Sequence, residues 1–321
     1  MRSITRTCLA ATAFMCTATF SVADEKFALP FDPRSLIQAG AEGDTAQIAQ
    51  TGTNIAAGMA SDYVRQQFLN FIPTAEVTLR LSDKYDLGGS ALVLVPVWEN
   101  DNHSSLVFTQ GSVTRFNDRT TTNIGLGARR LVMDKKLLLG ANAFYDQEWH
   151  IQHRRASVGG ELRTTVGELN FNYYVALTGW KDGQGVFEER AMDGWDVEVG
   201  APLPYMPRVK AYYSRFKWEA QSGSFDENGW RASLEGEVFP GVFVEVGKRH
   251  FEHSNNEMFT ALRLNLVDLL LNRDRKKPFF ADEPYKLASM EEHRYDKVRR
   301  ENLIRKEKRV LGNFTVTASG F

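Results

Sequence analysis

The sequence contains little cysteine, almost no charge imbalance and no long apolar run. Its 321 residues include only two cysteines, Cys8 and Cys16, and its formal net charge is -1 at pH 7. Balanced charge argues against nucleic-acid binding driven by bulk positive charge. An exported chain with no disulfide must be stabilised by a large core or by a fully hydrogen-bonded sheet. No stretch in the body of the chain approaches the roughly 18 apolar residues of a spanning helix, which leaves closed β-strands as a way to cross a membrane.

The first residues have the features of a secretion signal. Arg2 and Arg6 precede a mildly apolar run from Leu9 to Phe20, and Ser21-Val22-Ala23 supply small residues at alternate positions. We expect a signal peptide over residues 1–23, cleaved after the last of them. A buried first helix is the alternative, but the run has no amphipathic order and charged residues follow it at once. Cys16 lacks the leucine-rich approach of a lipoprotein signal, so no lipid anchor is expected.

Two periodicities divide the rest of the chain. In residues 24–72, Ile48, Ile55, Met59, Tyr63 and Phe68 recur at spacings of four, five or seven, which predicts a short amphipathic helical segment in the periplasm. From residue 73 the period becomes two, as in Ala75–Leu81, where apolar and polar residues alternate. Segments of this kind continue to residue 267 and give about twelve strands with no helix between them. The expected fold is all-β: a transmembrane antiparallel up-and-down β-barrel over residues 73–267.

A soluble β-sandwich shows the same alternation and is the alternative fold. Three features favour the barrel. The expected strands are about eight to ten residues long, which suits a tilted membrane strand. Long polar connections such as 178–193 alternate with short ones such as 164–168, as outer-membrane barrels require. Aromatic residues begin or end the apolar faces, as in an interfacial girdle, at Trp98, Tyr145, Trp195, Tyr213 and Trp230.

The polar faces of these strands predict a charged lumen. Charges on neighbouring strands can pair and keep the interior hydrated. Two interpretations stay open and are compatible, a polar conduit for an extended chain and a purely structural lattice of ion pairs. The residues expected to face the lumen are Glu76, Arg80, Arg129, Glu161, Arg163, Asp196, Glu198, Arg231, Glu235 and Glu237.

Neither a metal site nor an active site is expected. The histidine pairs His150 with His153 and His250 with His253 lie in expected loops without a set of carboxylates or cysteines. A serine hydrolase is the enzymatic alternative, but candidates such as Ser157 have no histidine at a matching height. The chain also shows no phosphate-binding glycine loop. We therefore expect no enzyme and no cofactor.

Three blocks of the sequence resemble the β-domain of intimin and invasin, the inverse autotransporters of bacterial outer membranes. The resemblance covers about residues 56–296. The blocks are Phe108-Thr109-Gln110-Gly111 continuing through Arg115, Asp118-Arg119 and Asn123-Ile124-Gly125-Leu126-Gly127; Ala141-Asn142-Ala143-Phe144 with Asp146; and Glu189-Arg190, Gly194-Trp195-Asp196 and Leu203-Pro204.

The resemblance implies a twelve-stranded barrel in the bacterial outer membrane and a linker that returns through the pore to display a surface passenger. Residues 268–321 are the expected linker and passenger start, and the charge-mixed stretch Glu291–Arg309 is expected to be solvated. Because the sequence stops at Phe321, most of the passenger is expected to be missing, and a barrel plugged by its own tail is the alternative. The implied partners are outer-membrane lipid, the export and barrel-assembly machinery and, with a passenger, a ligand on a host or neighbouring cell.

Overall fold

The computed structural model describes residues 20–22, 25–27, 71–84, 87–183, 187–221, 226–271 and 278–310. Most of the expected signal peptide and most of the expected helical segment lie outside these ranges. The described pieces before residue 71 are two short strands, β1 (Phe20–Val22) and β2 (Glu25–Phe27), which pair antiparallel. Within the described ranges, no helix has both the length and the apolar character needed to span a membrane.

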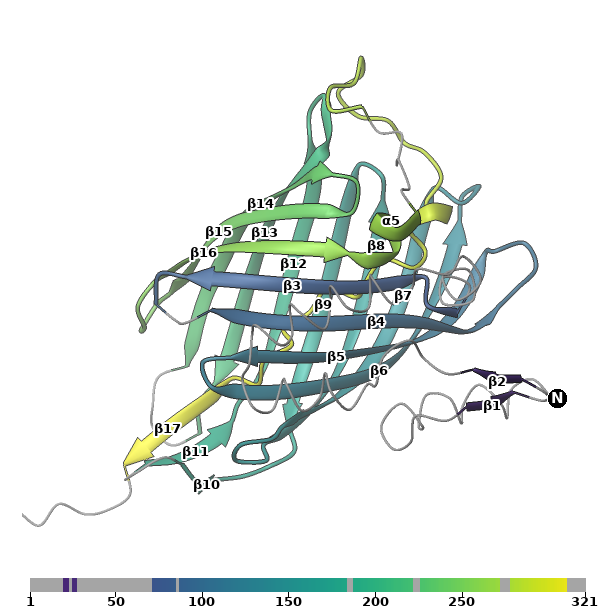
Figure 1. The fold of residues 1–321 in the computed structure, drawn as a ribbon. Coiled ribbons are helices and arrows are strands. Elements are labelled where there is room, and N and C mark those ends of the chain that lie inside the picture. Colours follow the sequence, from purple (N-terminus) through teal and green to yellow (C-terminus); the bar gives the residue numbers. More distant parts are fainter. Residues whose placement is uncertain are drawn as a thin grey trace, which may run out of the picture.

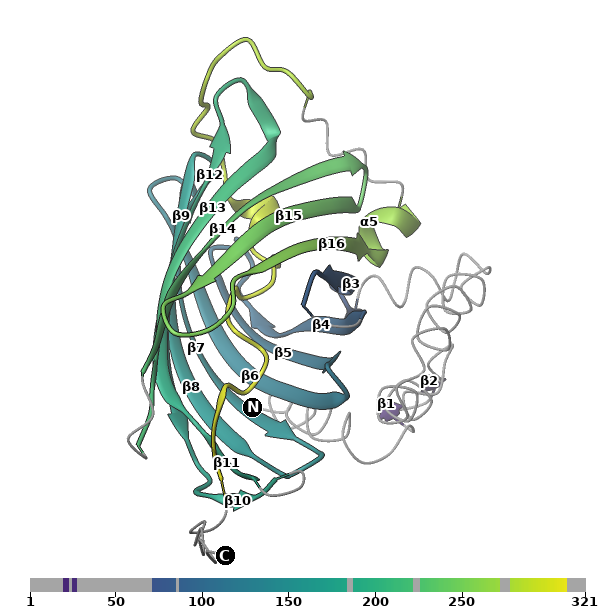
Figure 2. The same ribbon diagram turned by 90° about the vertical axis from the view of Figure 1, so that its left-hand side faces the viewer.

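Twelve strands close into one antiparallel barrel, which confirms the predicted fold class (Figures 1 and 2). Each strand pairs with its neighbours in the chain, and β16 returns to pair with β3, so that Leu264 lies opposite Val77. The strands are β3 (Thr74–Ser82), β4 (Gly88–Glu99), β5 (Ser105–Phe116), β6 (Arg119–Val132), β7 (Leu137–Glu148), β8 (Arg154–Thr164), β9 (Gly167–Ala176), β12 (Asp193–Leu203), β13 (Met206–Glu219), β14 (Glu227–Phe239), β15 (Val242–Phe251) and β16 (Glu257–Asn265).

The period-two pattern gives the barrel two chemically different faces. Along β9, for example, Phe171 and Tyr173 are 46% and 44% exposed on the outer face, whereas Asn170 and Asn172 are buried inside. Successive side chains of a strand point to opposite sides of the sheet, so one face must be apolar and the other polar. An apolar exterior around a polar interior is the arrangement of a membrane barrel.

Most of the strands are longer than expected. They run from 9 to 14 residues, with β6 and β13 the longest. The expected eight to ten residues suit the hydrocarbon layer alone. At the start of β6, residues Arg119–Asn123 are polar on both faces. At the end of β13, Phe216 and Trp218 are buried inside, whereas Lys217 and Glu219 lie on the outer side. The apolar outer face therefore ends before the hydrogen-bonded ladder does, so the pattern underestimates strand length.

The two ends of the barrel differ in their connections. At the near end, where β3 begins, the connections are 100–104, 133–136, 165–166, 204–205 and 240–241. At the far end, the longest connection spans 177–192 and contains β10 (Lys181–Asp182) and β11 (Phe187–Ala191). Short turns therefore collect at the near end, although the far-end turn at 117–118 is equally short.

The chain after β16 returns to the barrel and passes through it. A short helix, α5 (Leu266–Leu271), follows the last strand at the near end. Residues 278–290, which we call the strap, cross the near end and lead into a 3-10 turn at Glu291–His293. Residues 294–305, the threaded segment, run along the lumen, and β17 (Lys306–Val310) pairs with β11 at the far end. Figure 2 shows this path as the yellow chain inside the barrel.

Candidate functional site

The threaded segment enters the lumen beside Glu99, at the near end of β4. Arg294 Nε donates to one Glu99 carboxylate oxygen at 2.6 Å, and the Tyr295 hydroxyl donates to the other. Thr74 Oγ1, at the start of β3, donates to the Tyr295 carbonyl oxygen at 2.6 Å. One carboxylate and one hydroxyl on two adjacent strands therefore fix the chain at the mouth of the barrel.

Deeper in the lumen, three cations of the threaded segment pair with carboxylates on three separate strands, β3, β12 and β7. The pairs are Lys297 with Glu76, at 2.8 Å, Arg299 with Glu198, and Arg300 with Asp146. Ion pairs removed from bulk water are screened little and are costly to break, because a lone partner stays buried and charged. The order of cations along the threaded segment therefore matches the positions of the wall carboxylates in this register.

Asp146 forms the most enclosed of these pairs. It accepts two hydrogen bonds from Arg300, at 2.7 and 2.9 Å, and another from Arg155 Nε of β8, at 2.8 Å. The side chains of all three residues are fully buried. Arg300 also donates to Ser157 Oγ at 3.0 Å. One wall carboxylate thus binds a wall arginine and a tail arginine together.

A second set of wall residues binds the backbone of the threaded segment rather than its side chains. Side-chain donors from β6, β8 and β9 reach its carbonyl oxygens at 2.7 to 3.1 Å. Contacts with backbone carbonyls can hold any extended chain in the lumen, whatever its side chains. The wall carboxylates pair with particular cations and so set the register of the threaded segment. The contacts are Arg129 to the carbonyl of Arg294, Arg163 to that of Lys297, Asn172 to that of Arg299, Asn123 to that of Asn302, and Arg155 to those of Glu301 and Leu303.

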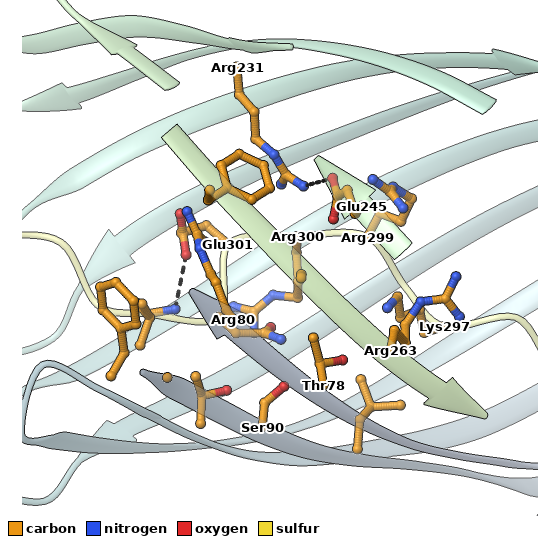
Figure 3. Close-up of a pocket in the computed structure, with 18 of the residues that line it drawn as sticks. Thr78, Arg80, Ser90, Arg231, Glu245, Arg263, Lys297, Arg299, Arg300 and Glu301 are labelled. Carbon is orange, nitrogen blue, oxygen red and sulfur yellow. Dashed lines mark hydrogen bonds and ion pairs between the residues drawn. The ribbon is translucent and has the colours of Figure 1, made fainter. Parts of the chain in front are cut away.

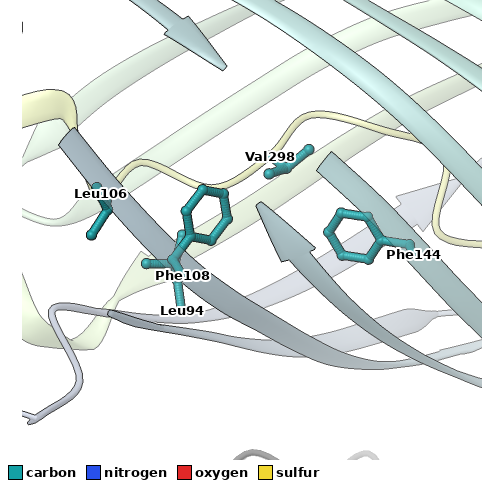
Figure 4. Close-up of a cluster of buried hydrophobic side chains, with 5 residues drawn as sticks. All are labelled: Leu94, Leu106, Phe108, Phe144 and Val298. Carbon is teal, nitrogen blue, oxygen red and sulfur yellow. The ribbon is translucent and has the colours of Figure 1, made fainter. Parts of the chain in front are cut away.

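An apolar cluster interrupts the polar lumen at Val298. Val298 packs against buried side chains of β4, β5 and β7, and its backbone N–H donates to Gln110 Oε1 at 2.8 Å (Figure 4). Two glycines of β6 make room for the rings of the cluster. A Cβ at Gly127 would lie 2.2 Å from the Phe108 ring, and one at Gly125 would lie 2.4 Å from the Phe144 ring. The glycine spacing of β6 therefore lets two aromatic rings lie flat on the wall beneath the tail.

The threaded segment does not fill the lumen. A cavity of about 230 Å³ lies between it and the wall formed by β3–β5 and β12–β16 (Figure 3). Arg263 bridges Glu76 and Glu235 at 2.9 Å to each, and Arg231 pairs with Glu245. Glu76 also binds Lys297 of the threaded segment, at 2.8 Å. The wall-to-wall pairs and the pairs with the tail therefore share this carboxylate.

The tail leaves the far end through a small sheet, the exit sheet, formed by β10, β11 and β17. Glu189 of β11 is fully buried and lies 2.8 Å from Arg119 and 3.2 Å from Lys308. Burial opposes its ionisation, but the charges of Lys306 and Arg119 outweigh burial and lower the pKa of Glu189. Burial and the neighbouring Arg119 lower the pKa of Lys306 to about 8. A strand of the tail is therefore fixed at the far end by pairing and by charge.

All ten residues expected to face the lumen lie on the inner side of their strands. Six of them reach the tail or a residue that holds it. Glu76 and Glu198 bind tail cations, Arg129 and Arg163 bind tail carbonyls, and Glu161 accepts two hydrogen bonds from Arg129. Asp196 accepts hydrogen bonds from Tyr174 and Asn172, which both bind the tail. The other four bind the wall, with Arg80 paired to Glu257, Arg231 to Glu245, Glu235 to Arg263, and Glu237 to the Gly241 amide.

The residues carried by the family resemblance have varied positions. Gln110 and Asn123 touch the tail, and Gly125 and Gly127 accommodate aromatic rings, whereas a Cβ at Gly111 would meet only ordinary contacts. The remaining residues shape the ends and strand contacts: Arg115 and Asp118 pair at a far-end turn, Arg119 pairs with Glu189, Gly194 lies against the Trp218 ring, Trp195 and Asp196 lie in β12, and Leu203 and Pro204 lead into a near-end turn.

Several residues that hold the tail were not among the predicted lumen set. Glu99, Arg155 and Tyr174 are missing from it, although Tyr174 donates to Asp196 and accepts from the Glu301 amide at 2.7 Å. Asp146 belonged to a family block but had no assigned role. Alternation along the strand could have placed Asp146, Arg155 and Tyr174 on the inner face. It could not have placed Glu99 there, because a bulge between Pro96 and Trp98 shifts the register of β4. The expected solvated linker is also wrong for residues 294–305, because Arg300 is fully buried and the cations pair with the wall.

The histidines and serines considered as chemical sites have other contacts. His153 is buried in the far-end loop with its Nδ1 3.3 Å from Thr178 Oγ1, and burial lowers its pKa to about 4. His250 Nδ1 lies 2.7 Å from Asn256 Oδ1, and its ring stacks on Trp230. Ser157 binds Arg300. Among the described residues, no group of three or more His, Cys, Asp or Glu side chains could hold a metal ion.

Comparison with known proteins agrees with this geometry. Residues 34–302 match the family described as "Inverse autotransporter, beta-domain". The chain belongs to the inverse autotransporter β-domain family. Its barrel is therefore a translocator and anchor of the bacterial outer membrane.

Three curated relatives illustrate the extent of the similarity. A putative attaching and effacing protein homolog of Escherichia coli K12 is 32% identical over 164 residues, which cover 49% of this chain and 55% of that protein. Intimin of Escherichia coli O127:H6 is 27% identical over 272 residues, which cover 82% and 28%. Invasin of Yersinia enterocolitica is 29% identical over 184 residues, which cover 55% and 22%. The chain thus matches between about a fifth and about half of the length of these relatives.

A solved structure described as "Unveiling the Mechanism Behind the in-meso Crystallization of Membrane Proteins" has the same fold. It superposes with a TM-score of 0.61 at 22% identity and covers 74% of this chain and all of that chain. The family and the closed barrel confirm the predicted resemblance and the predicted location in the outer membrane.

Proposed function

We propose that this barrel anchors the chain in the outer membrane, with its far end facing the outside, and holds the threaded segment so that the residues after it are displayed on the surface. One observation carries the proposal. The chain enters at the near end beside Glu99, follows the lumen, and pairs as β17 with β11 at the opposite end. A segment fixed at both mouths and along its length joins one side of the membrane to the other.

The pattern of contacts supports a defined resting register for the displayed chain. Backbone carbonyls are held by arginine and asparagine side chains of β6, β8 and β9, which would hold any extended sequence. The wall carboxylates Glu76, Glu198 and Asp146 pair with particular cations. A shift of one residue would place Val298 beside a carboxylate and leave buried charges unpaired. We infer that export stops where these pairs form.

The test is accessibility of an epitope tag placed after Phe321 in intact cells that express the full chain. Antibody binding to intact cells, equal to binding after the outer membrane is permeabilised, is the expected result. A matched control carries the same tag in the near-end turn between Lys135 and Lys136, where binding should require permeabilisation. A tag after Phe321 that is reached only in permeabilised cells would overturn the proposal.

A barrel plugged by its own tail is the second candidate, because the threaded segment occupies the lumen and leaves only a cavity of about 230 Å³ beside it. Planar-bilayer conductance of the full chain and of a variant ending at Asp268 measures this property. A large rise on deletion shows that the tail seals the pore. Display and sealing are compatible, and only the tag experiment decides whether the chain also reaches the surface.

We infer a mechanical rather than a catalytic role, because Ser157 Oγ accepts a hydrogen bond from Arg300 and His153 contacts a threonine in a far-end loop. A nucleophilic serine would need a histidine base within hydrogen-bond reach. Hydrolysis of ester substrates by the folded protein in detergent would contradict this inference. The barrel needs lipid, the general export machinery and the barrel-assembly machinery as partners, and a surface ligand is a partner of whatever chain is displayed.

A further inference from the structure

The strap is bound to the near-end turns of the barrel by its backbone. Five hydrogen bonds of 2.7 to 3.2 Å join it to three turns, two of which have positive φ at the residue that makes the contact. The strap is therefore held along the rim rather than suspended from it. The bonds are Ala281 N–H to Tyr205 O, Tyr205 N–H to Pro284 O, Thr165 Oγ1 to Lys286 O, Ala288 N–H to Thr165 Oγ1, and Met290 N–H to Lys135 O.

The side chains of the strap are unusual for a segment whose backbone is already satisfied by the barrel. Phe279 and Phe280 pack edge to face, with ring centroids 4.9 Å apart, yet they are 46% and 70% exposed. Tyr285 and Leu287, further along, are also exposed. These four side chains thus leave apolar surface exposed to water, and a partner that covered this surface would gain binding free energy.

The neighbouring rim has the same character. Tyr205, which exchanges two backbone hydrogen bonds with the strap, is half exposed, and Phe239 at the end of β14 is 68% exposed. Trp98 near the end of β4 is also exposed at this end of the barrel. Aromatic residues gather where a membrane barrel leaves the hydrocarbon layer, because their rings suit the headgroup region.

We propose that the strap is a lipid-binding edge: Phe279 and Phe280 enter the phospholipid headgroup layer at the near end and continue the aromatic girdle of the wall. The occupant is the lipid surface itself, because the two rings directly precede Ala281, which is bonded to Tyr205 at the aromatic rim of a barrel that already faces lipid. The consequence is mechanical. Lipid would hold the strap from outside while the near-end turns hold it from inside, so the point where the tail enters the lumen would be fixed relative to the membrane.

The test uses the full chain with both cysteines replaced by serine and a single cysteine at position 280, labelled with a nitrobenzoxadiazole dye. The protein is folded into vesicles of phosphatidylethanolamine and phosphatidylglycerol, and the dye is quenched by doxyl-labelled lipid or by aqueous iodide. We expect lipid quenching at F280C to exceed that at E283C, on the same strap, by at least about twofold, with the reverse order for iodide.

L126C, on the lipid-facing wall, is the control for insertion of the barrel, because Leu126 is 58% exposed on the outer face. Altered migration of unheated samples in gel electrophoresis checks that each variant folds. Strong quenching by lipid at position 126, together with iodide quenching and no lipid quenching at position 280, would overturn the proposal and leave the barrel and its function intact. A dye at position 280 that is shielded from both quenchers would point to a protein partner and would also overturn it.

Discussion

Asp146 of β7 holds Arg300 of the tail with two hydrogen bonds of 2.7 and 2.9 Å, although 154 positions separate them in the sequence. The same carboxylate holds Arg155 of the adjacent strand. One carboxylate therefore binds both the barrel wall and the tail. Its removal should lower the stability of the wall and weaken the binding of the tail in the lumen.

Replacement of Asp146 by Asn should be strongly destabilising. The change leaves Arg155 and Arg300 buried beside each other without their carboxylate, a situation that costs about 3–5 kcal/mol of unfolding free energy. Urea unfolding in detergent or lipid measures it. Asp118→Asn is the matched control, since that carboxylate is 86% exposed in its pair with Arg115 and should contribute within about 1 kcal/mol. Equal losses in the two variants would contradict the assignment.

The register of the tail can be tested by a charge exchange. Glu198→Arg and Arg299→Glu should each weaken the binding of the tail in the lumen, because each leaves two like charges next to each other. The double variant restores an ion pair and should recover a substantial part of the loss. Protease cleavage of the tail in folded protein reports the effect. Losses that simply add in the double variant would show that the pair does not set the register.

Gly127 of β6 and Gly111 of β5 should differ in their tolerance of alanine. A Cβ at Gly127 would lie 2.2 Å from the Phe108 ring, whereas one at Gly111 of β5 would approach nothing closer than 3.9 Å. Gly127→Ala should therefore cost about 1–3 kcal/mol through forced displacement of the ring. Gly111→Ala should be nearly neutral. The midpoint of denaturant unfolding compares the two, and similar midpoints would count against close packing beneath Val298.

The hydroxyl of Tyr295 should stabilise the near-end mouth. It donates to Glu99, while Arg294 occupies the other oxygen of the same carboxylate. Tyr295→Phe removes that donor and keeps the ring. We expect it to lower the free energy of unfolding by about 1.5–3 kcal/mol, as for a hydrogen bond to a charged group. More frequent openings in planar-bilayer recordings should accompany it. Tyr285→Phe, at an exposed position on the strap, is the control and should leave the recordings unchanged.

The far-end loop that holds His153 should weaken in acid. Burial lowers the pKa of His153 to about 4 from an ordinary value of 6.5, with Lys306 and Lys181 opposing its protonation and Glu148 and Glu189 favouring it. Between these two pH values the unfolded chain binds more protons than the folded chain, so stability rises with pH across this window and is lost as pH falls. His153→Gln should flatten this dependence in unfolding measured at pH 7 and pH 5. His150→Gln, in the same loop but exposed, should not.

The sequence predicts the barrel better than it predicts the contacts of the lumen. Period two is a local property, so the alternation around Glu76 and Arg129 was enough to assign their side of the sheet. Which charge meets which depends on the path of a segment more than 100 positions away, as with Arg299 and Glu198. No local pattern contains that path. The strand ends were also missed, because β6 and β13 continue their hydrogen bonds past the point where the outer face stops being apolar.

The closed ladder around the threaded segment has a mechanical consequence. A tether that runs through a complete ring, with wall side chains bonded along its length and β17 paired at the far mouth, transmits tension into the wall at many points. Tension applied to the surface end of the tail would act along the axis of the threaded segment. The hydrogen bonds between this segment and the wall would then bear the force together instead of breaking one after another. Force applied outside the cell would therefore be resisted by the whole hoop of strands.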